Sequence, residues 1–262
     1  MEHKTVSRDE WLKARIEHLA REKELTRLRD QLSAERRELP WVKIEKIYVF
    51  DAPQGRVTLA DLFGGRSQLI IKHFMLPPGQ EHPCVGCSFE VDHIEGALVH
   101  LEHHDVTYVA VARAPLAEIA AVKKRMGWRF NWVSSFGSDF NYDFHVSFTK
   151  DQIARGEVYY NYKMSPIPME DLSGHSVFYK NDNGEIFHTY SSFGRGAEEL
   201  LGTYVCLDIT PKGRNETGPN YSLTDWVRPH DKYDAGGSVD EMGRYSPPEV
   251  PGSCCGGSNG GS

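Results

Sequence analysis

Apolar residues recur at helical spacing near the start of the chain, at Leu12, Ile16, Leu19, Leu25, Leu28 and Leu32. Ser7 and Glu10 precede this run in the order of a capping box, and Pro40 ends it. The other face is dense in Arg, Lys, Glu and Asp, as solvated helix faces usually are. We therefore predict an N-terminal helical arm over residues 1–40. Its apolar stripe is expected to pack on the rest of the protein or on a second subunit of a homo-oligomer.

After Trp41 the pattern changes to short β-type runs that alternate with helical ones. Strands are predicted at 46–50, 57–63, 68–75 and 106–112, and helices at 84–102 and 116–126. The runs 68–75 and 106–112 are apolar almost throughout, which is typical of strands in a sheet covered on both faces. The order strand, helix, strand, helix predicts a parallel βαβ unit with right-handed crossovers.

Three later segments have different characters. Residues 176–180 and 185–190 flank a turn of Asn, Asp and Gly, which predicts an antiparallel hairpin. The region 127–164 carries so many aromatic side chains that we expect an ordered insertion rather than a wet loop. Residues 215–262 lose apolar periodicity and end in a Gly/Ser-rich tail. The predicted division is an arm (1–40), an α/β domain of mixed strand direction (41–214) and an irregular extension (215–262).

Composition narrows the classes of function. The chain has 262 residues with 30 Lys plus Arg against 37 Asp plus Glu, and this net charge of −7 argues against nucleic acid as a partner. There is no apolar run of the roughly 20 residues that cross a bilayer, and no secretory signal, so we expect a cytoplasmic protein without a membrane partner. Five Cys are too few for a disulfide scaffold.

The sharpest motif is a CxxC sequence, Cys84-Val85-Gly86-Cys87, between an apolar strand and a predicted helix. A sulfur at a helix N-terminus faces unpaired N–H groups and the positive end of the helix dipole, and both favour a thiolate. We therefore expect Cys84 to be the more acidic and more exposed thiol. In this hypothesis Cys84 attacks a disulfide of a protein or small molecule, and Cys87 resolves the mixed disulfide.

Other interpretations of the CxxC motif stay open at this point. Haem attachment requires a His immediately after the motif, and Ser88 stands there. A zinc or copper site would need further ligands, for which His73, His82, Cys254 and Cys255 are candidates. Inert packed thiols on an interaction scaffold are the third alternative. The Pro-x-x-x-Thr-x-x-Cys pattern of peroxide reduction is missing. For the dithiol interpretation, no bound metal or other cofactor is expected.

The order of these elements resembles the thioredoxin fold, in which a dithiol follows the first strand of a βαβ unit. A closer resemblance is to a bacterial family described as thioredoxin-like proteins of unknown function or as dithiol-disulfide oxidoreductases. It spans roughly Trp11 to Arg214. The blocks that carry it are Asp61–Leu69, His73–Met75, Cys84–Phe89, Arg113–Leu116, Met126–Trp128, Trp132–Ser135, Asp139–Asn141, Tyr160–Tyr162 and Leu207–Pro211. The resemblance implies a mixed sheet flanked by helices and a redox role for the cysteines.

The chain departs from the general thioredoxin pattern in ways that affect its site. Pro83 and Gly86 stand where Trp and Pro precede the two cysteines of a typical thioredoxin. The resemblance implies a cis-proline near Gly174–Ser176, and His175 takes that place as a group able to hold a proton. Arg113, at the carboxyl end of the neighbouring strand, either lowers a thiol pKa or holds an anion, or forms a structural salt bridge.

Other polar and sulfur-bearing residues have simpler interpretations. We expect His73 to be a hydrogen-bonded core histidine rather than a partner of the sulfurs. Asp139 and Asn141 are expected to cap turns. Cys206 is expected to be a buried, inert residue on a strand, and the pair Cys254 and Cys255 to belong to a functionless tail.

Overall fold

The computed structural model describes residues 3–219 and 221–248. By the contacts within it, the chain forms two units, Met1–Val42 and Lys43–Ser262. This division into two units does not test the predicted division into an arm (1–40), an α/β domain (41–214) and an extension (215–262), which stays a prediction. Cys254 and Cys255 lie outside the described residues.

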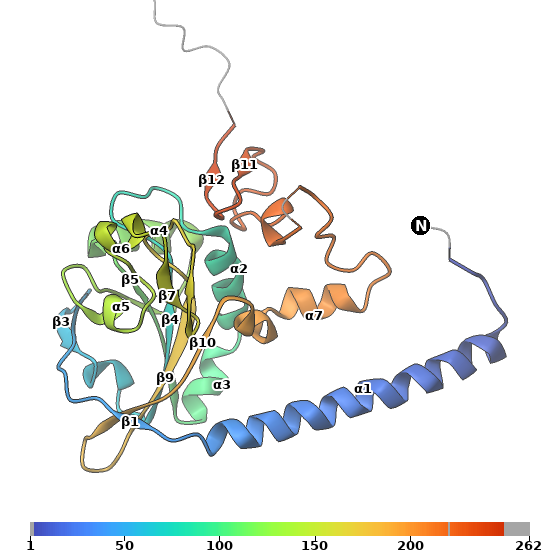
Figure 1. The fold of residues 1–262 in the computed structure, drawn as a ribbon, viewed down its shortest axis with the longest axis horizontal. Helices are drawn as coiled ribbons and strands as arrows, with labels where there is room; N and C mark the ends of the chain where they lie inside the picture. Colours follow the sequence, from blue (N-terminus) through green and yellow to red (C-terminus); the bar gives the residue numbers. More distant parts are fainter. Residues whose placement is uncertain (1–2, 220, 249–262) are drawn as a thin grey trace, which may run out of the picture. The chain divides into compact units, whose positions relative to one another are not determined.

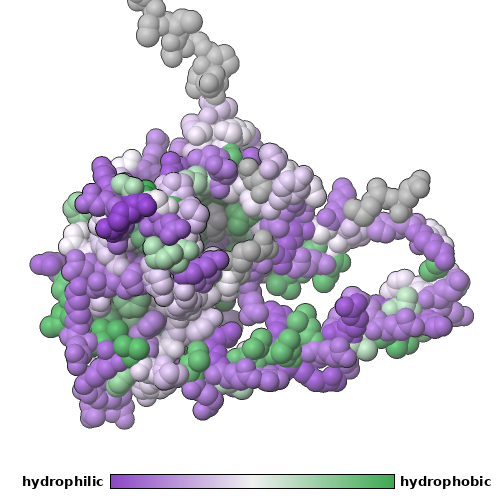
Figure 2. Space-filling model, in the orientation of Figure 1, coloured by the Kyte–Doolittle hydropathy of each residue, from purple (hydrophilic) through white to green (hydrophobic). Residues whose placement is uncertain are grey.

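The first unit is dominated by one long helix, α1 (Arg8–Arg37), drawn in blue in Figure 1. Ser7 caps it, and the side chains of Ser7 and Glu10 form the predicted capping box. The helical arm is therefore confirmed. None of its residues is buried, and Figure 2 shows apolar side chains between charged ones along α1. The partner of this apolar stripe, including a second subunit, stays a prediction.

The second unit is built on an eight-stranded mixed sheet. In sheet order its strands are β1 (Val42–Lys43), β10 (Ile186–Phe193), β9 (Gly174–Lys180), β4 (Gln68–His73), β5 (Val106–Ala112), β6 (Asn131–Ser134), β2 (Val49–Ala52) and β3 (Gly55–Thr58). Strands β4, β5 and β6 are parallel, and β9 runs antiparallel to β4 and to β10. The predicted βαβ unit and hairpin are confirmed. Together they give the thioredoxin-like α/β fold that the resemblance implied.

Helices lie on both sides of this sheet (Figure 1). Helices α2 (Val85–Ile94), α3 (Leu98–His103) and α4 (Leu116–Met126) pack on one face, and α5 (Phe140–Asp143) packs on the other. The remaining helices are α6 (Lys150–Ala154) and α7 (Gly202–Asp208), of which α7 packs on α2. Single 3₁₀ turns occur at Asp61–Phe63, Gly194–Leu200 and Leu223–Asp225. Two small hairpins, β7 (Val158–Tyr160) with β8 (Lys163–Ser165) and β11 (Ser238–Val239) with β12 (Tyr245–Ser246), lie outside the main sheet.

Several predicted boundaries were wrong. The single helix expected at 84–102 is two helices, α2 and α3, because the chain turns at Glu95–Ala97, where the N–H of Ala97 donates to the carbonyl of Ile94 and Gly96 is a poor helix former. The strand expected at 46–50 is β2, which begins at Val49. The run 57–63 is a strand only to Thr58 and then a 3₁₀ turn. Helix α4 matches its prediction and ends at Gly127, whose φ of 68° is the left-handed conformation that favours glycine.

The alternation of β5 divides the core into two layers. Tyr108, Ala110 and Ala112 face the layer that includes α2 and α4, whereas Val109 and Val111 face the layer on the opposite side of the sheet. Almost all of these side chains are buried completely. The expectation of a sheet covered on both faces is therefore confirmed.

The aromatic region 127–164 is not an insertion. Residues Asn131–Ser134 form β6, which pairs with β5 inside the main sheet. Trp128, Phe130 and Trp132 pack in the layer of α2 and α4, and Phe140 packs in the opposite layer. The aromatic side chains are many because this stretch supplies both layers of the core. Strand β6 has only four residues and follows aromatic ones, so its sequence does not show the alternation of polar and apolar residues by which longer strands are recognised.

The extension after residue 215 is also more ordered than expected. Val227 and Tyr245 pack against Val85 and Phe89 of α2, where they form a third apolar cluster. The β11–β12 hairpin, which we call the C-terminal hairpin (residues 238–246), lies next to the first turn of α2 (Figure 1). Within the described part of the chain, none of the helices is long and apolar enough to cross a membrane.

This core predicts the effect of two aromatic truncations. Trp132→Ala removes a side chain that is only 2% exposed and should lower the free energy of unfolding by about 3–5 kcal/mol. Phe136→Ala, four residues later and 56% exposed, should change it by less than about 0.5 kcal/mol. Urea denaturation followed by circular dichroism measures both, and equal losses in the two variants would contradict the placement of β6 in the core.

Candidate functional site

The CxxC motif lies where the sheet and α2 meet. Strand β4 runs on into Phe74 and Met75, a loop follows, and Cys84 takes the N-cap position of α2. The carbonyl of Cys84 accepts hydrogen bonds from the backbone and side chain of Ser88, which fixes the first turn. Cys87 lies one turn further on the same face of the helix. The local sequence thus brings both sulfurs to one end of the helix.

Both cysteines are free thiols and nearly buried, Cys84 at 8% and Cys87 at 2% exposure. Their side chains are hydrogen-bonded to each other. The backbone N–H groups of Gly86 and Cys87 point to the Cys84 sulfur, and the N–H of Met75 points to the Cys87 sulfur. The pair is therefore arranged to share one proton, as a thiol that donates to a thiolate.

A charged cluster lies beneath this pair, inside the protein. Lys72, on β4, is fully buried, and its Nζ lies 2.5 Å from Glu90 Oε2 and 2.6 Å from Ser173 Oγ. The other Glu90 oxygen lies 2.5 Å from His175 Nε2. Glu90 follows Cys87 by one helical turn, and His175 is the neighbour of Lys72 on β9. We call Lys72, Glu90, Ser173 and His175 the buried charge cluster.

The protonation states in the cluster follow from its charges. Burial opposes the charge on Lys72, but the adjacent Glu90 and the cysteine sulfurs outweigh it and raise the Lys72 pKa. Burial likewise opposes the charge on Glu90, and Lys72 and His175 outweigh it, so the pKa of Glu90 is lowered. Burial and the nearby Lys72 lower the pKa of His175. At neutral pH the cluster therefore holds a lysine cation, a carboxylate and a neutral histidine that donates to Glu90.

The same charges act on the two sulfurs differently. Burial raises the pKa of Cys87, but the hydrogen bond from Cys84, the charge of Lys72 and the N–H of Met75 bring it down to about 6. The pKa of Cys84 lies well above the ordinary value, because its thiol donates to Cys87 and is buried. The prediction that Cys84 is the more acidic thiol was therefore wrong. The helix N-terminus does face Cys84, but the hydrogen bond that this thiol donates keeps its proton in place, and the same bond together with the charge of Lys72 favours the thiolate of Cys87.

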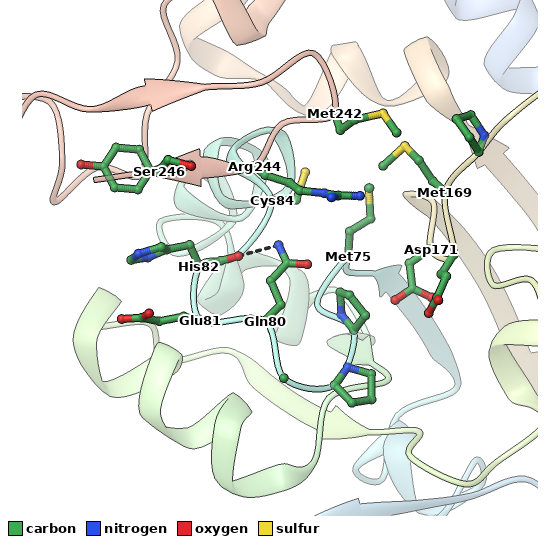
Figure 3. A pocket seen from close by; sticks show the side chains of 16 residues that line it. Met75, Gln80, Glu81, His82, Cys84, Met169, Asp171, Met242, Arg244 and Ser246 are labelled. Carbon is green, nitrogen blue, oxygen red and sulfur yellow. Dashed lines mark hydrogen bonds between the residues drawn. The ribbon is translucent and has the colours of Figure 1, made fainter. Parts of the chain in front are cut away.

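The Cys84 sulfur lies at the wall of a cavity in the described part of the chain. Cys84 lines an open cavity of about 650 Å³, which we call the dithiol cavity, together with Met75, Pro77, Pro78, Gly79, Gln80, Glu81, His82, Pro168, Met169, Glu170, Asp171, Met242, Arg244, Tyr245 and Ser246 (Figure 3). Cys87 is not among the lining residues that the structure describes there. The expectation that Cys84 is the more accessible thiol is thus consistent with the cavity, although both sulfurs are largely covered.

The C-terminal hairpin closes one side of this site. The carbonyl of Gly243 accepts a 3.0 Å hydrogen bond from the N–H of Val85, the first residue of α2. Gly243 has a φ of 76°, and a Cβ there would lie 3.4 Å from the Cys84 sulfur. A side chain at this position would be strained by the backbone and would press on Cys84. Glycine therefore permits the turn of the hairpin to lie directly against the attacking face of the thiol.

Arg113 reaches the cavity through a carboxylate. Its Nε lies 2.6 Å from Asp171 Oδ1, and its other nitrogens contact Tyr142 and Glu170. Asp171 lines the dithiol cavity. The structure thus shows the salt bridge that the sequence left as one alternative for Arg113. His175 similarly binds Glu90 through its Nε2, and the described peptide bonds are all trans. The catalytic roles assigned to Arg113 and His175 stay predictions.

The remaining candidates divide between core and surface. His73 binds Ser176 Oγ at 2.8 Å and stacks on Phe140 in the opposite layer, so the expectation of a hydrogen-bonded core histidine is confirmed. His82 lines the dithiol cavity, and burial lowers its pKa. Asp139 pairs with Lys46 on the surface. Asn141 is buried and accepts a hydrogen bond from Ser135.

The expectation for Cys206 was wrong. This residue lies on α7 rather than on a strand, and it is exposed. Tyr204 of the same helix packs against Phe89. Positions two apart on a helix point to nearly opposite sides, so Cys206 faces away from that contact.

The zinc or copper site that the sequence left open, with cysteine and histidine ligands, finds no such ligand cluster in the described part of the chain. Across residues 3–219 and 221–248, the structure holds no group of three or more His, Cys, Asp or Glu side chains that could bind a metal ion. His73 lies in the opposite layer of the core from the cysteines. Cys254 and Cys255, the other candidate ligands, are outside the described residues.

Two central residues of the site, Lys72 and Glu90, were missed by the sequence analysis. A signal for each is present in hindsight: Lys72 interrupts an otherwise apolar strand, and Glu90 stands between Phe89 and Val91 on a mostly apolar helix. Charged residues in such positions are rarely buried unless they are paired. The pairing itself depends on how α2 packs on β4, which no local pattern specifies.

The role of Lys72 can be measured by titration. The thiolate absorbance of the reduced protein at 240 nm should rise with an apparent pKa of about 6. Removing the cation by Lys72→Met should raise this pKa, because the thiolate loses its counter-charge. Lys46→Met removes an exposed lysine that pairs with Asp139 and should leave the pKa unchanged.

The single variant leaves Glu90 as an unpaired buried charge and should cost about 3–5 kcal/mol of stability. The double variant Lys72→Met/Glu90→Gln avoids that charge. It should show a smaller upward shift of the thiol pKa, because the charge of Glu90 raises that pKa and is also removed, together with a smaller loss of stability. A thiol titration unchanged in both variants would show that Lys72 does not act on the dithiol.

Comparison with solved structures gives remote likenesses. Peroxiredoxin Q from Xanthomonas campestris is 15% identical, with a TM-score of 0.40 over 61% of this chain and 89% of that chain. Peroxidoxin BcpB from Mycobacterium tuberculosis is 12% identical, with a TM-score of 0.38 over 62% and 94%. The mitochondrial 2-Cys peroxiredoxin from Plasmodium falciparum is 14% identical, with a TM-score of 0.38 over 62% and 88%. Likeness at this level says nothing of activity.

The sequence comparison is more specific. None of the curated proteins matches the chain. The sequence profile of one family, described as a bacterial protein of unknown function (DUF899), matches residues 1–233. That stretch holds the helical arm, the whole sheet, both cysteines of the CxxC motif and the buried charge cluster. The chain therefore belongs to the DUF899 family of bacterial proteins.

Proposed function

We propose that this protein is a thiol-disulfide oxidoreductase that uses the Cys84–Cys87 dithiol. The observation that carries the proposal is the asymmetry of the pair. Two hydrogen-bonded free thiols lie at the N-terminus of one helix, one at the wall of a cavity and the other above a buried lysine. Inert packed thiols would need neither the cavity nor the buried counter-charge.

The first step of the proposed reaction takes place at Cys84. In the resting reduced state the shared proton lies on Cys84 and the negative charge on Cys87. As a disulfide enters the cavity, the proton passes along the hydrogen bond to Cys87 and leaves Cys84 as the thiolate. The Cys84 sulfur forms a bond to one substrate sulfur, and the substrate S–S bond breaks. The first product leaves as a thiolate.

The second step closes the internal disulfide. Cys87 loses its proton and attacks the Cys84 sulfur of the mixed disulfide, and the second substrate sulfur leaves. One product has then left as a thiol and the other as a thiolate, which conserves the single proton and the single negative charge of the reduced pair. The spacing of Cys84 and Cys87 by one helical turn suits a short intramolecular bridge.

The buried charge cluster supports both steps through electrostatics. Lys72 stabilises negative charge on Cys87, so that the dithiol is ionised near neutral pH. Glu90 prevents the lysine from losing its proton in an apolar surrounding. His175, neutral and bound to Glu90, holds that carboxylate in place. In this proposal Lys72, Glu90 and His175 are positioning residues, and only the two cysteines react.

The dithiol cavity limits the substrate to disulfides that can approach Cys84. Its walls are mostly loops, the segment from Pro77 to His82 on one side and the C-terminal hairpin on another. Asp171 offers Oδ2, a buried oxygen for which the described residues provide no hydrogen-bond donor. A substrate N–H group beside its disulfide could bind there. We therefore propose a cysteine-containing peptide or small disulfide as the substrate.

Single cysteine variants test the assignment of roles. Cys84→Ser should lower the rate of disulfide reduction by at least about 100-fold, because the nucleophile is gone. Cys206→Ser, which changes an exposed thiol on α7, should leave the rate unchanged. Reduction of a chromogenic disulfide measures both rates. Full activity in Cys84→Ser would end the proposal.

The resolving role of Cys87 gives a different outcome. Cys87→Ser should still complete the first step and then accumulate a mixed disulfide at Cys84. Mass spectrometry of the protein after one exposure to the substrate detects the added mass and its position. A mixed disulfide at Cys87 in the Cys84→Ser variant, and not the converse, would reverse the roles of the two sulfurs.

A further inference from the structure

The dithiol cavity has an unusual set of apolar side chains. Three of the six methionines of the chain, Met75, Met169 and Met242, line it. Its other apolar side chains are prolines and Tyr245. Among its lining residues in the described part of the chain there is no Leu, Ile, Val or Phe. A merely apolar wall would be expected to mix methionine with branched aliphatic residues, which are the commoner choice in packed sites.

The sulfur atoms in this cavity come from four separate parts of the chain. Met75 follows β4, Cys84 begins α2, Met169 lies in the loop before β9, and Met242 lies in the turn of the C-terminal hairpin. Figure 3 shows the three thioether ends turned toward the same part of the cavity that the Cys84 thiol faces. All three methionines are half-buried rather than packed in the core.

The backbone holds each methionine in place. The carbonyl of Met75 accepts a hydrogen bond from the N–H of Cys84. The N–H of Met242 donates to Asp240 Oδ1 at 3.0 Å within a tight turn. Glu170, the residue after Met169, accepts a backbone hydrogen bond from Phe148 at 2.9 Å. The arrangement of the four sulfurs is thus fixed by the fold on every side of the cavity.

Thioether and thiolate sulfurs are soft ligands, and among biological metals they favour Cu(I). We propose that the dithiol cavity is a Cu(I) site whose ligands are Met75, Met169, Met242 and Cys84. Binding forms a bond between Cu(I) and the Cys84 sulfur and releases the thiol proton to solvent, with no change of oxidation state. Zinc fits this set poorly, because its protein ligands are thiolate, imidazole and carboxylate groups.

The charges around the cavity suit a monovalent cation. Three carboxylates, Glu81, Glu170 and Asp171, line it, against the one guanidinium of Arg244. Arg113 pairs with two of these carboxylates from outside the lining. Asp171 is only 5% exposed, and its Oδ2 lacks a hydrogen-bond donor in the described residues. Three carboxylates thus face two guanidinium groups around the cavity as a whole, and Glu81 lies away from the methionines in Figure 3. Near the sulfurs, Asp171 Oδ2 is the oxygen that offers negative charge to a cation.

The proposed copper site does not depend on disulfide exchange, but Cu(I) bound there would affect that exchange. Coordination to Cu(I) lowers the nucleophilicity of the Cys84 sulfur and fills the space through which a disulfide would approach it, so the metal should inhibit exchange. Met242 belongs to the C-terminal hairpin, whereas Met75 and Cys84 belong to the sheet and α2. Metal binding would therefore also fasten the hairpin to the first turn of α2.

Competition with a chromogenic Cu(I) chelator, bicinchoninate, tests the site directly. The protein is the full-length chain, reduced and kept under anaerobic conditions, with Cys254→Ser and Cys255→Ser, because a vicinal thiol pair binds Cu(I) by itself. It should take one equivalent of Cu(I) from the chelator. Changing Met75, Met169 and Met242 together to Leu should weaken binding by at least about tenfold, as loss of metal-site groups does.

Met164→Leu is the matched control, because Met164 is 55% exposed on β8 and outside the cavity. It should bind Cu(I) like the parent protein. The triple Leu variant retains both cysteines, so its circular dichroism spectrum and its number of titratable thiols report on the fold separately from metal binding. Weaker Cu(I) binding with both of these unchanged supports the site.

Two results would overturn it. If the parent protein leaves Cu(I) with the chelator, the cavity is not a copper site. If the triple Leu variant binds Cu(I) as tightly as the parent, the cysteines alone hold the metal and the methionines serve another purpose, such as contact with an apolar substrate. A raised KM for the disulfide in that same variant would identify the second case.

Discussion

A lysine and a glutamate are buried side by side beneath the two cysteines, and the site depends on them. Removing two charges from water costs several kcal/mol per ion, so such a pair persists only with good geometry and further hydrogen bonds. Lys72 and Glu90 meet this condition because Lys72 also donates to Ser173 and Glu90 also binds His175. Lys72 lies on β4, Glu90 on α2 and His175 on β9, so the buried charge cluster links these three elements. Any shift of α2 along the sheet would separate the charges as well as the sulfurs from their support.

The position of the lysine explains the division between the two cysteines. The helix N-terminus offers N–H groups to Cys84, and this contribution can be predicted from the position of Cys84 at the start of a helix in the sequence. The ammonium of Lys72 acts from the other side and on Cys87, which is deeper. A full charge at short range in a buried site outweighs the partial charges of a helix end. The thiol that meets the cavity is consequently the one that keeps the proton at rest.

The sequence was informative where a signal is local. The capping box at Ser7, the helix ended by Gly127 and the hairpin around Asn181–Gly184 depend on neighbouring residues, and the structure has all three. The sequence failed where the outcome depends on distant parts of the chain. Strand β6 was taken for part of an insertion, because its four residues become a strand only by pairing with β5. The pairing of Lys72 with Glu90 similarly depends on the packing of α2 on β4.

The C-terminal hairpin lies beyond the stretch that defines the family. The DUF899 profile ends at residue 233, whereas Gly243 rests against Cys84 and Met242 faces the same cavity. The two sulfurs and the hairpin that closes one side of their cavity thus lie in different parts of the sequence. A substitution in this hairpin would reshape the cavity wall and leave Lys72 and Glu90, which lie below the cysteines, paired as before.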